Sequence, residues 1–157
     1  MSEDEKFMGA AIKEAVIARG KGDYAIGAVI VKDGQIIARA PNRSKIDNDA
    51  TKHAEMVAIQ RASKKLKSRY LNGCILYTTH EPCPMCAAAA VWAKLSRIVS
   101  GARIEDMAGY SFENGNDDWK WRTIRITARE VLEKGEPKVE IIEEFMRAEC
   151  RKLFYDT

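Results

Sequence analysis

The sequence predicts an α/β fold, in which helices and strands alternate along one chain. Apolar residues recur with helical spacing in some segments and as extended runs in others, and the two patterns replace each other several times. The 157 residues have 46% hydrophobic content, which suffices for one core of ordinary size. We therefore expect a single domain over residues 1–157.

The first elements are a helix and a hairpin. An apolar face with helical spacing that ends at Gly20 predicts a helix over residues 5–20. Apolar runs at residues 25–31 and 35–40 flank Asp33-Gly34, a pair that favours a tight turn between antiparallel strands. These runs are therefore expected to form a hairpin.

The middle of the chain predicts a parallel pair of strands joined by a helix. In chain order we expect a polar loop at 42–51, a helix that carries His53, a strand at 74–79, a helix at 86–93 and a strand at 96–101. Strands joined in this way are parallel, and the connection is nearly always right-handed.

The last third of the chain is less regular. A strand is expected at residues 138–142, and apolar residues with helical spacing predict a closing helix over 144–155. The pattern of residues 104–137 favours neither a helix nor a strand.

Two short motifs carry the chemistry. His53-Ala54-Glu55 precedes Pro82-Cys83-Pro84-Met85-Cys86, so one imidazole and two thiols are available as ligands. Zn²⁺ favours nitrogen and thiolate ligands, and catalytic zinc sites use three of them so that water or hydroxide takes the fourth position. We predict one Zn²⁺ per chain on His53, Cys83 and Cys86. Glu55 is expected to act as the catalytic carboxylate that moves protons.

Other interpretations of these motifs remain open at this stage. A structural zinc site would need a fourth protein ligand, for which the sequence offers His80, Cys74 and Cys150. A C-x-x-C pair is also found in redox proteins. A non-catalytic module stabilised by zinc is the third interpretation, and the presence of Glu55 argues against it.

The charge pattern does not single out a polyanion as partner. There are 26 basic and 23 acidic residues, which give a net charge of +3. The stretch 61–69 carries five positive charges on an expected helix, where a solvated face and an RNA contact are both conceivable. The first residues are acidic and no apolar run has the length of a membrane span, so we expect a cytoplasmic protein without a membrane partner.

The motifs and their surroundings resemble the cytidine deaminase-like superfamily of zinc-dependent deaminases, and within it the guanine deaminase branch. The matching segments are Ile26–Gly34, Asn42, Cys74–Thr78, Glu81–Cys86 and Trp92-Ala93. Asn116-Asp117-Asp118-Trp119 is similar to a segment whose second aspartate contacts the base in that branch. Ala25-Ile26 depart from the Pro-Phe that the branch presents to its substrate.

The resemblance implies a three-layer α/β/α sandwich around a five-stranded mixed sheet, and a homodimer. It also implies four substrate contacts, namely Asn42, Trp92, Asp118 and Tyr155, the last on a C-terminal tail that closes the partner's site. Alternatively, Asn42 is a turn residue, Trp92 belongs partly to the core and Tyr155 packs a terminal helix.

The predicted function is hydrolytic deamination of a free nucleobase or nucleoside, with guanine or a related aminopurine as the expected small-molecule substrate. Adenosine deamination in transfer RNA is the alternative, because similar zinc motifs and the basic stretch at 61–69 also suit it. Cytosine deamination is a further alternative, since the superfamily motif is shared between purines and pyrimidines.

Overall fold

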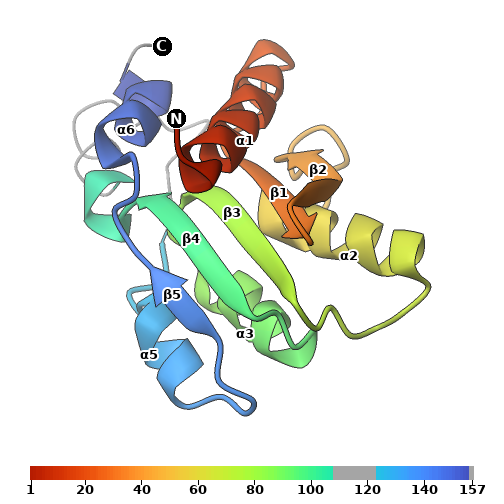
Figure 1. The fold of residues 1–157 in the computed structure, drawn as a ribbon. Helices are drawn as coiled ribbons and strands as arrows, with labels where there is room; N and C mark the ends of the chain where they lie inside the picture. Colours follow the sequence, from red (N-terminus) through yellow and green to blue (C-terminus); the bar gives the residue numbers. More distant parts are fainter. Residues whose placement is uncertain (108–122, 156–157) are drawn as a thin grey trace.

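A five-stranded mixed sheet runs through the computed structural model, which describes residues 1–107 and 123–155 (Figure 1). Its strands are β1 (Gly27–Lys32), β2 (Gln35–Pro41), β3 (Cys74–His80), β4 (Arg97–Ala102) and β5 (Glu140–Ile142). They lie in the order β2-β1-β3-β4-β5, with β1 antiparallel to both neighbours and β3, β4 and β5 mutually parallel. The expected mixed sheet is confirmed.

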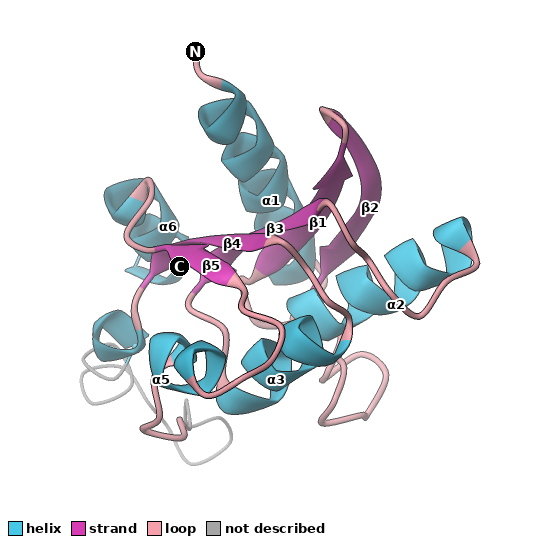
Figure 2. Ribbon diagram, turned by 60° about the horizontal axis from the view of Figure 1, so that its bottom comes forward, coloured by secondary structure: helices cyan, strands magenta, loops and turns pink. Residues whose placement is uncertain are grey.

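Helices cover both faces of this sheet. They are α1 (Glu3–Gly20), α2 (Ala54–Leu66), α3 (Pro84–Trp92), α5 (Ala128–Glu133) and α6 (Arg147–Tyr155). Figure 2 shows α1 and α6 on one face, and α2, α3 and α5 on the other. The three-layer α/β/α architecture is therefore confirmed. None of the described helices combines the length and apolar character that a membrane crossing requires.

The hairpin between β1 and β2 forms at the predicted pair. Asp33 and Gly34 both have positive φ, at 50° and 75°, as a two-residue turn of type I′ requires. Gly27, at the start of β1, is needed for another reason: a Cβ there would collide with the backbone of Ala11 and Ala15. Helix α1 can therefore pack directly onto β1.

Some boundaries differ from the expected ones. The segment without a clear preference contains α5, whose N-cap Thr127 accepts a hydrogen bond from Glu130 N–H. The last helix begins at Arg147 and not at residue 144, because Glu144 and Met146 adopt positive φ. Asp118 lies outside the described residues.

The topology places two helix N-termini at the end of the sheet where the parallel strands terminate. Helix α3 begins just beyond the carboxyl end of β3, with Cys83 as its N-cap residue. Helix α2 packs beside α3 and has His53 as its N-cap residue. In α/β sheets, ligands bind outside the carboxyl ends of parallel strands.

Candidate metal centre

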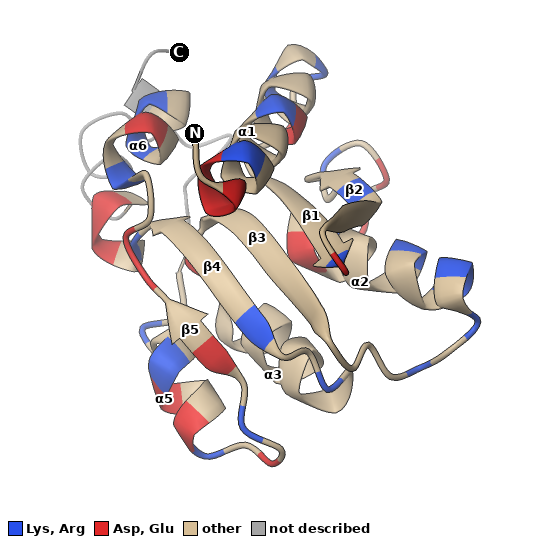
Figure 3. Ribbon diagram, viewed as in Figure 1, with Lys and Arg blue, Asp and Glu red and all other residues tan. Residues whose placement is uncertain are grey.

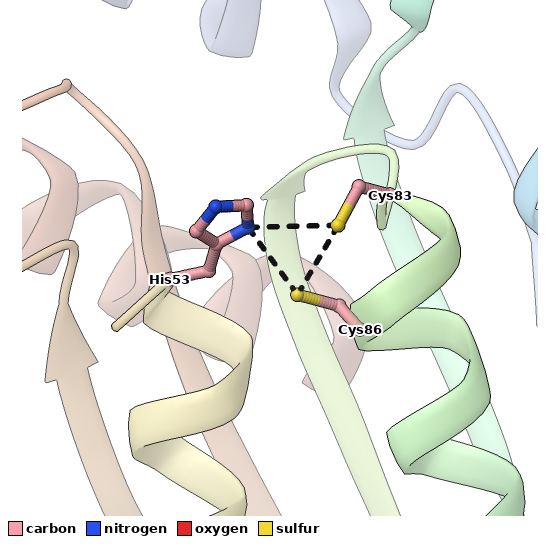
Figure 4. A group of neighbouring side chains, drawn as sticks. All are labelled: His53, Cys83 and Cys86. Atoms are coloured by element: carbon pink, nitrogen blue, oxygen red, sulfur yellow. Dashed lines mark hydrogen bonds between the residues drawn. The ribbon is translucent and has the colours of Figure 1, made fainter. Parts of the chain in front are cut away.

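Three ligand atoms meet where α2 and α3 begin (Figure 4). His53 Nδ1 lies 3.5 Å from Cys83 Sγ and 3.6 Å from Cys86 Sγ, and the two sulfur atoms are 3.7 Å apart. The three residues come from segments that are 30 residues apart in the sequence. The fold therefore assembles the predicted ligand set.

These separations match a zinc tetrahedron. With Zn–S bonds of roughly 2.3 Å and a Zn–N bond of roughly 2.0 Å, the S···S edge is about 3.8 Å and the N···S edges about 3.5 Å. The separations between the ligand atoms of His53, Cys83 and Cys86 agree with these values, so the side chains are already arranged as zinc binding requires. The donor set fits Zn²⁺, which strongly favours this combination of imidazole and thiolates.

The fourth coordination position is left open by the described residues. Only His53, Cys83 and Cys86 form the ligand group found there, so the alternative ligands Cys74 and Cys150 do not complete it. His80 turns its Nδ1–H to the carbonyl oxygen of Glu81, at 2.7 Å. The closed structural site considered above is not what the described part of the chain forms.

The two thiols of the ligand set differ in their pKa values. The hydrogen bond from Cys86 and the proximity of His53 lower the pKa of Cys83 to about 4, whereas the same hydrogen bond and burial raise the pKa of Cys86. One thiolate and one thiol thus share a proton at neutral pH. A metal ion displaces that proton, since both sulfur ligands bind as thiolates.

Glu55 lies in the first turn of α2 and is only 3% exposed. Its Oε1 is buried and has no hydrogen-bond partner among the described residues. Burial raises the pKa of this carboxyl group to about 7, and the neighbouring His53 opposes the shift. A buried carboxylate with an unused oxygen beside an open metal position is suited to accept a proton from a bound water molecule.

A pocket of about 790 Å³ opens beside these residues. Its lining includes His53 and Cys83 from the ligand set, Asn42 and Lys45 from the loop before α2, and Ile124 from the segment before α5. Its volume falls within the range of small-molecule sites. Asn42, predicted from the sequence as a substrate contact, thus lies beside the metal centre.

The other predicted contacts are placed differently. Trp92 ends α3, whereas the thiols are at its start, and its side chain is 81% exposed and does not line the pocket. Tyr155 is the last residue of α6, and its side chain, like all of Asp118, is outside the described residues. These three contacts stay predictions.

Sequence reasoning missed two buried carboxylates that support the site. Asp23 accepts hydrogen bonds from the loop that carries Asn42. Glu81 accepts hydrogen bonds from Ile104 N–H and Ala128 N–H. No sequence signal distinguishes such residues from solvated acids, because their partners, most of them backbone N–H groups, are brought near only by the fold.

An open three-ligand zinc site with a buried carboxylate, set at two helix N-termini of an α/β/α sandwich, defines the class of zinc-dependent hydrolases. Residues 1–102 match the family model described as the cytidine and deoxycytidylate deaminase zinc-binding region. The chain belongs to this family of zinc-dependent deaminases.

Individual relatives include enzymes of two kinds. A tRNA-specific adenosine deaminase of Bacillus subtilis is 48% identical over 65% of this chain and 63% of its own length. One of Buchnera aphidicola is 33% identical over 96% of this chain and 85% of its own length. A guanine deaminase of B. subtilis is 48% identical over 56% of each chain. This chain thus spans just under two thirds of the first relative.

A solved structure extends the likeness to the three-dimensional fold. A chain from a study of A-to-I editing by tRNA:A34 deaminases has a TM-score of 0.77 and 32% identity, and covers 95% of this chain and 99% of its own.

These comparisons correct the expected substrate. The resemblance to guanine deaminases is real, but the prediction of guanine is wrong, because the tRNA-specific adenosine deaminases match more of the chain. The zinc motifs determine the hydrolytic chemistry and are shared between the two groups, so they did not discriminate between substrates. The departure of Ala25-Ile26 from the guanine deaminase pattern was the one signal in the sequence against the assignment of guanine.

Proposed function

We propose that this chain deaminates adenosine in transfer RNA, replacing the amino group at C6 of the base by oxygen and releasing ammonia, so that adenosine becomes inosine. The observation that carries this proposal is the tRNA-specific adenosine deaminase of B. aphidicola, which is similar over 96% of this chain. The other relatives of this kind match the part that contains the metal centre.

The charge distribution supports an RNA substrate. Between residues 56 and 104 eight residues are Lys or Arg, and the only acidic one, Glu81, is buried. Figure 3 shows several of these basic residues along the second half of α2 and the loop after it. Arg97 and Arg103 pair with acidic residues, whereas the stretch 61–69 holds five basic residues and no acidic one. Such a stretch attracts the phosphate backbone, and the attraction weakens as salt is added.

The pocket also suits a nucleotide taken out of a strand. Deaminases that act on nucleic acids extrude the target base into a pocket where its edge is hydrogen-bonded. The pocket of about 790 Å³ is lined by polar Asn42, Ser44 and Asn48 as well as apolar Ile26 and Met85. It therefore offers both hydrogen bonds and an apolar surface to a purine.

The residues of the chain divide the reaction between them. Zinc held by His53, Cys83 and Cys86 would supply Lewis-acid chemistry, lowering the pKa of water at the open position to roughly 7. Glu55 accepts one proton from the attacking water and passes it to the ring nitrogen; it then takes the proton of the new hydroxyl group at C6 and passes it to the departing amine. Its buried Oε1 is free for this exchange. Water oxygen is added to C6, the C–N bond breaks, and the nitrogen leaves as ammonia.

We also propose that residues 1–157 act as one deaminase domain and that the protein is a homodimer in the cytoplasm, where its proposed substrate is used. Trp92, an aromatic residue 81% exposed at the end of an otherwise apolar helix, supports an interface with a second copy. Light scattering on the purified protein tests this, and a monomer at all concentrations would contradict it.

The proposed function is tested by ammonia release from zinc-loaded protein with an anticodon stem-loop, full-length transfer RNA and the free nucleoside, with Glu55→Gln as the blank. We expect turnover of the RNA substrates, with an apparent KM that rises with salt. Turnover confined to free nucleosides or bases would reject it.

A further inference from the structure

The carboxylate of Asp23 accepts four hydrogen bonds although it is only 6% exposed. Its Oδ1 accepts from Tyr24 N–H and from Asn42 Nδ2, both at 2.8 Å. Its Oδ2 accepts from Lys45 N–H at 3.1 Å and Ile46 N–H at 3.0 Å. A buried charge is tolerated when its lone pairs are satisfied in this way, and here the donors come from two segments.

These bonds decide how the Asn42 side chain is oriented. Its Nδ2 donates one hydrogen to Asp23 Oδ1 and the other to Ser44 Oγ, at 2.9 Å. The opposite orientation would point the amide oxygen at the carboxylate, which is repulsive. Asn42 Oδ1 has no hydrogen-bond partner among the described residues. It is not one of their fully buried unpaired polar atoms, so it keeps some contact with solvent. Because Asn42 lines the pocket, this oxygen is the atom that it offers there.

We propose that Asp23 is a positioning residue for substrate recognition: it locks the Asn42 carboxamide and the turn at residues 44–46, so that the pocket presents a hydrogen-bond acceptor. The recognised group is then an N–H or O–H donor of the bound nucleoside. This inference rests on the proposed function, since it deepens the recognition of the same substrate. Asp23 itself lies behind Asn42 and is not a member of the pocket lining.

The kinetic test is Asp23→Asn, which keeps the shape but replaces one acceptor oxygen by an NH₂ group that faces N–H donors. We expect KM for the RNA substrate to rise about tenfold or more, kcat to change less than about threefold, and zinc to stay at one per chain. Asp47→Asn is the matched control, because Asp47 pairs with Arg43 at the surface of the same loop. An equal rise in KM in Asp23→Asn and in Asp47→Asn would overturn the proposal.

A double-mutant cycle separates positioning from general support of the fold. If Asp23 acts through Asn42, then Asp23→Asn raises KM much less in an Asn42→Ala background than in the wild type. Fully additive changes in log KM would show that Asp23 does not act through Asn42.

Hydrogen exchange tests the same idea without activity. In the wild type, the amide hydrogens of Lys45 and Ile46 and the side-chain NH₂ of Asn42 should exchange much more slowly than other loop amides. The Asp23→Asn protein, if folded, should lose this protection. Fast exchange in the wild type would overturn the positioning role of Asp23 even if transfer RNA is deaminated. Slow exchange in a protein that does not turn over transfer RNA would support the positioning role and reject the proposed function.

Discussion

Glu81 Oε2 accepts a hydrogen bond from Ala128 N–H at 3.1 Å, across 47 residues of chain. The other oxygen of this buried carboxylate accepts from Ile104 N–H at 3.3 Å. Glu81 precedes the zinc-binding loop directly, and Ala128 is the first residue of α5. The bond therefore ties the C-terminal part of the chain to the metal centre and brings Thr123 and Ile124 to the pocket.

Replacing Glu81 by Gln should destabilise the protein by about 1–3 kcal/mol, because an NH₂ group then faces a backbone N–H and one buried donor loses its partner. Denaturant unfolding of the zinc-loaded protein measures the loss. Glu133→Gln, an exposed change on α5, is the control and should fall within roughly 0.5 kcal/mol of the wild type. If the two variants were equally stable, the hydrogen bonds to Glu81 would make no measurable contribution to stability.

The role of Glu55 is tested by Glu55→Gln, which keeps the size of the side chain but removes its capacity to carry a proton. We expect full zinc content with a loss of about 10²–10⁴ in kcat, as for other general acid–base groups. Metal analysis and ammonia release on the same sample measure both quantities. Appreciable turnover by the zinc-loaded variant would rule out proton transfer by this carboxylate.

His53→Ala should lose zinc, because two thiolates alone leave the ligand triangle incomplete. Elemental analysis after dialysis against a weak chelator gives the zinc occupancy, with the exposed change Thr51→Ala as the control. Full occupancy in His53→Ala would show that the ligand set is wrong.

Removal of zinc from the wild type should abolish activity, and readdition of zinc should restore it. In a non-catalytic module, removal of zinc would change only the stability of the protein.

The buried His80 predicts a dependence of stability on pH. Burial lowers its pKa to about 4, and the hydrogen bond to Glu81 and the charges of Cys83 and Asp106 oppose the shift only in part. The unfolded chain, with a histidine pKa of about 6.5, binds more protons between these values. Stability should therefore be fully present above about pH 6.5 and fall by on the order of 3 kcal/mol towards pH 4.

Unfolding of wild type and His80→Asn across this pH range measures the effect. Acid also releases zinc and protonates carboxylates, but both proteins share these losses, so the difference between the curves reports on His80. The variant should have the shallower dependence. Parallel curves would mean that His80 is not held neutral by the fold.

Local patterns predicted much of the fold because they depend on near neighbours in the chain. The pair Asp33-Gly34 determines a turn by its backbone preference alone. The spacing of Cys83 and Cys86 places two sulfur atoms at the start of one helix, 3.7 Å apart. Helix α5 was not predicted, since six residues offer too short a pattern to distinguish it from a loop.

The sequence by itself determined the zinc chemistry, since His53, Glu55 and the two cysteines are residue types with few alternative uses at that spacing. The tertiary structure decided which residues surround the chemistry. It brought Asp23 to Asn42 and Glu81 to Ala128, and it placed Trp92 away from the pocket. The reason is that a ligand set is specified by side-chain identity, whereas a hydrogen bond between groups far apart in the chain depends on how helices and strands pack.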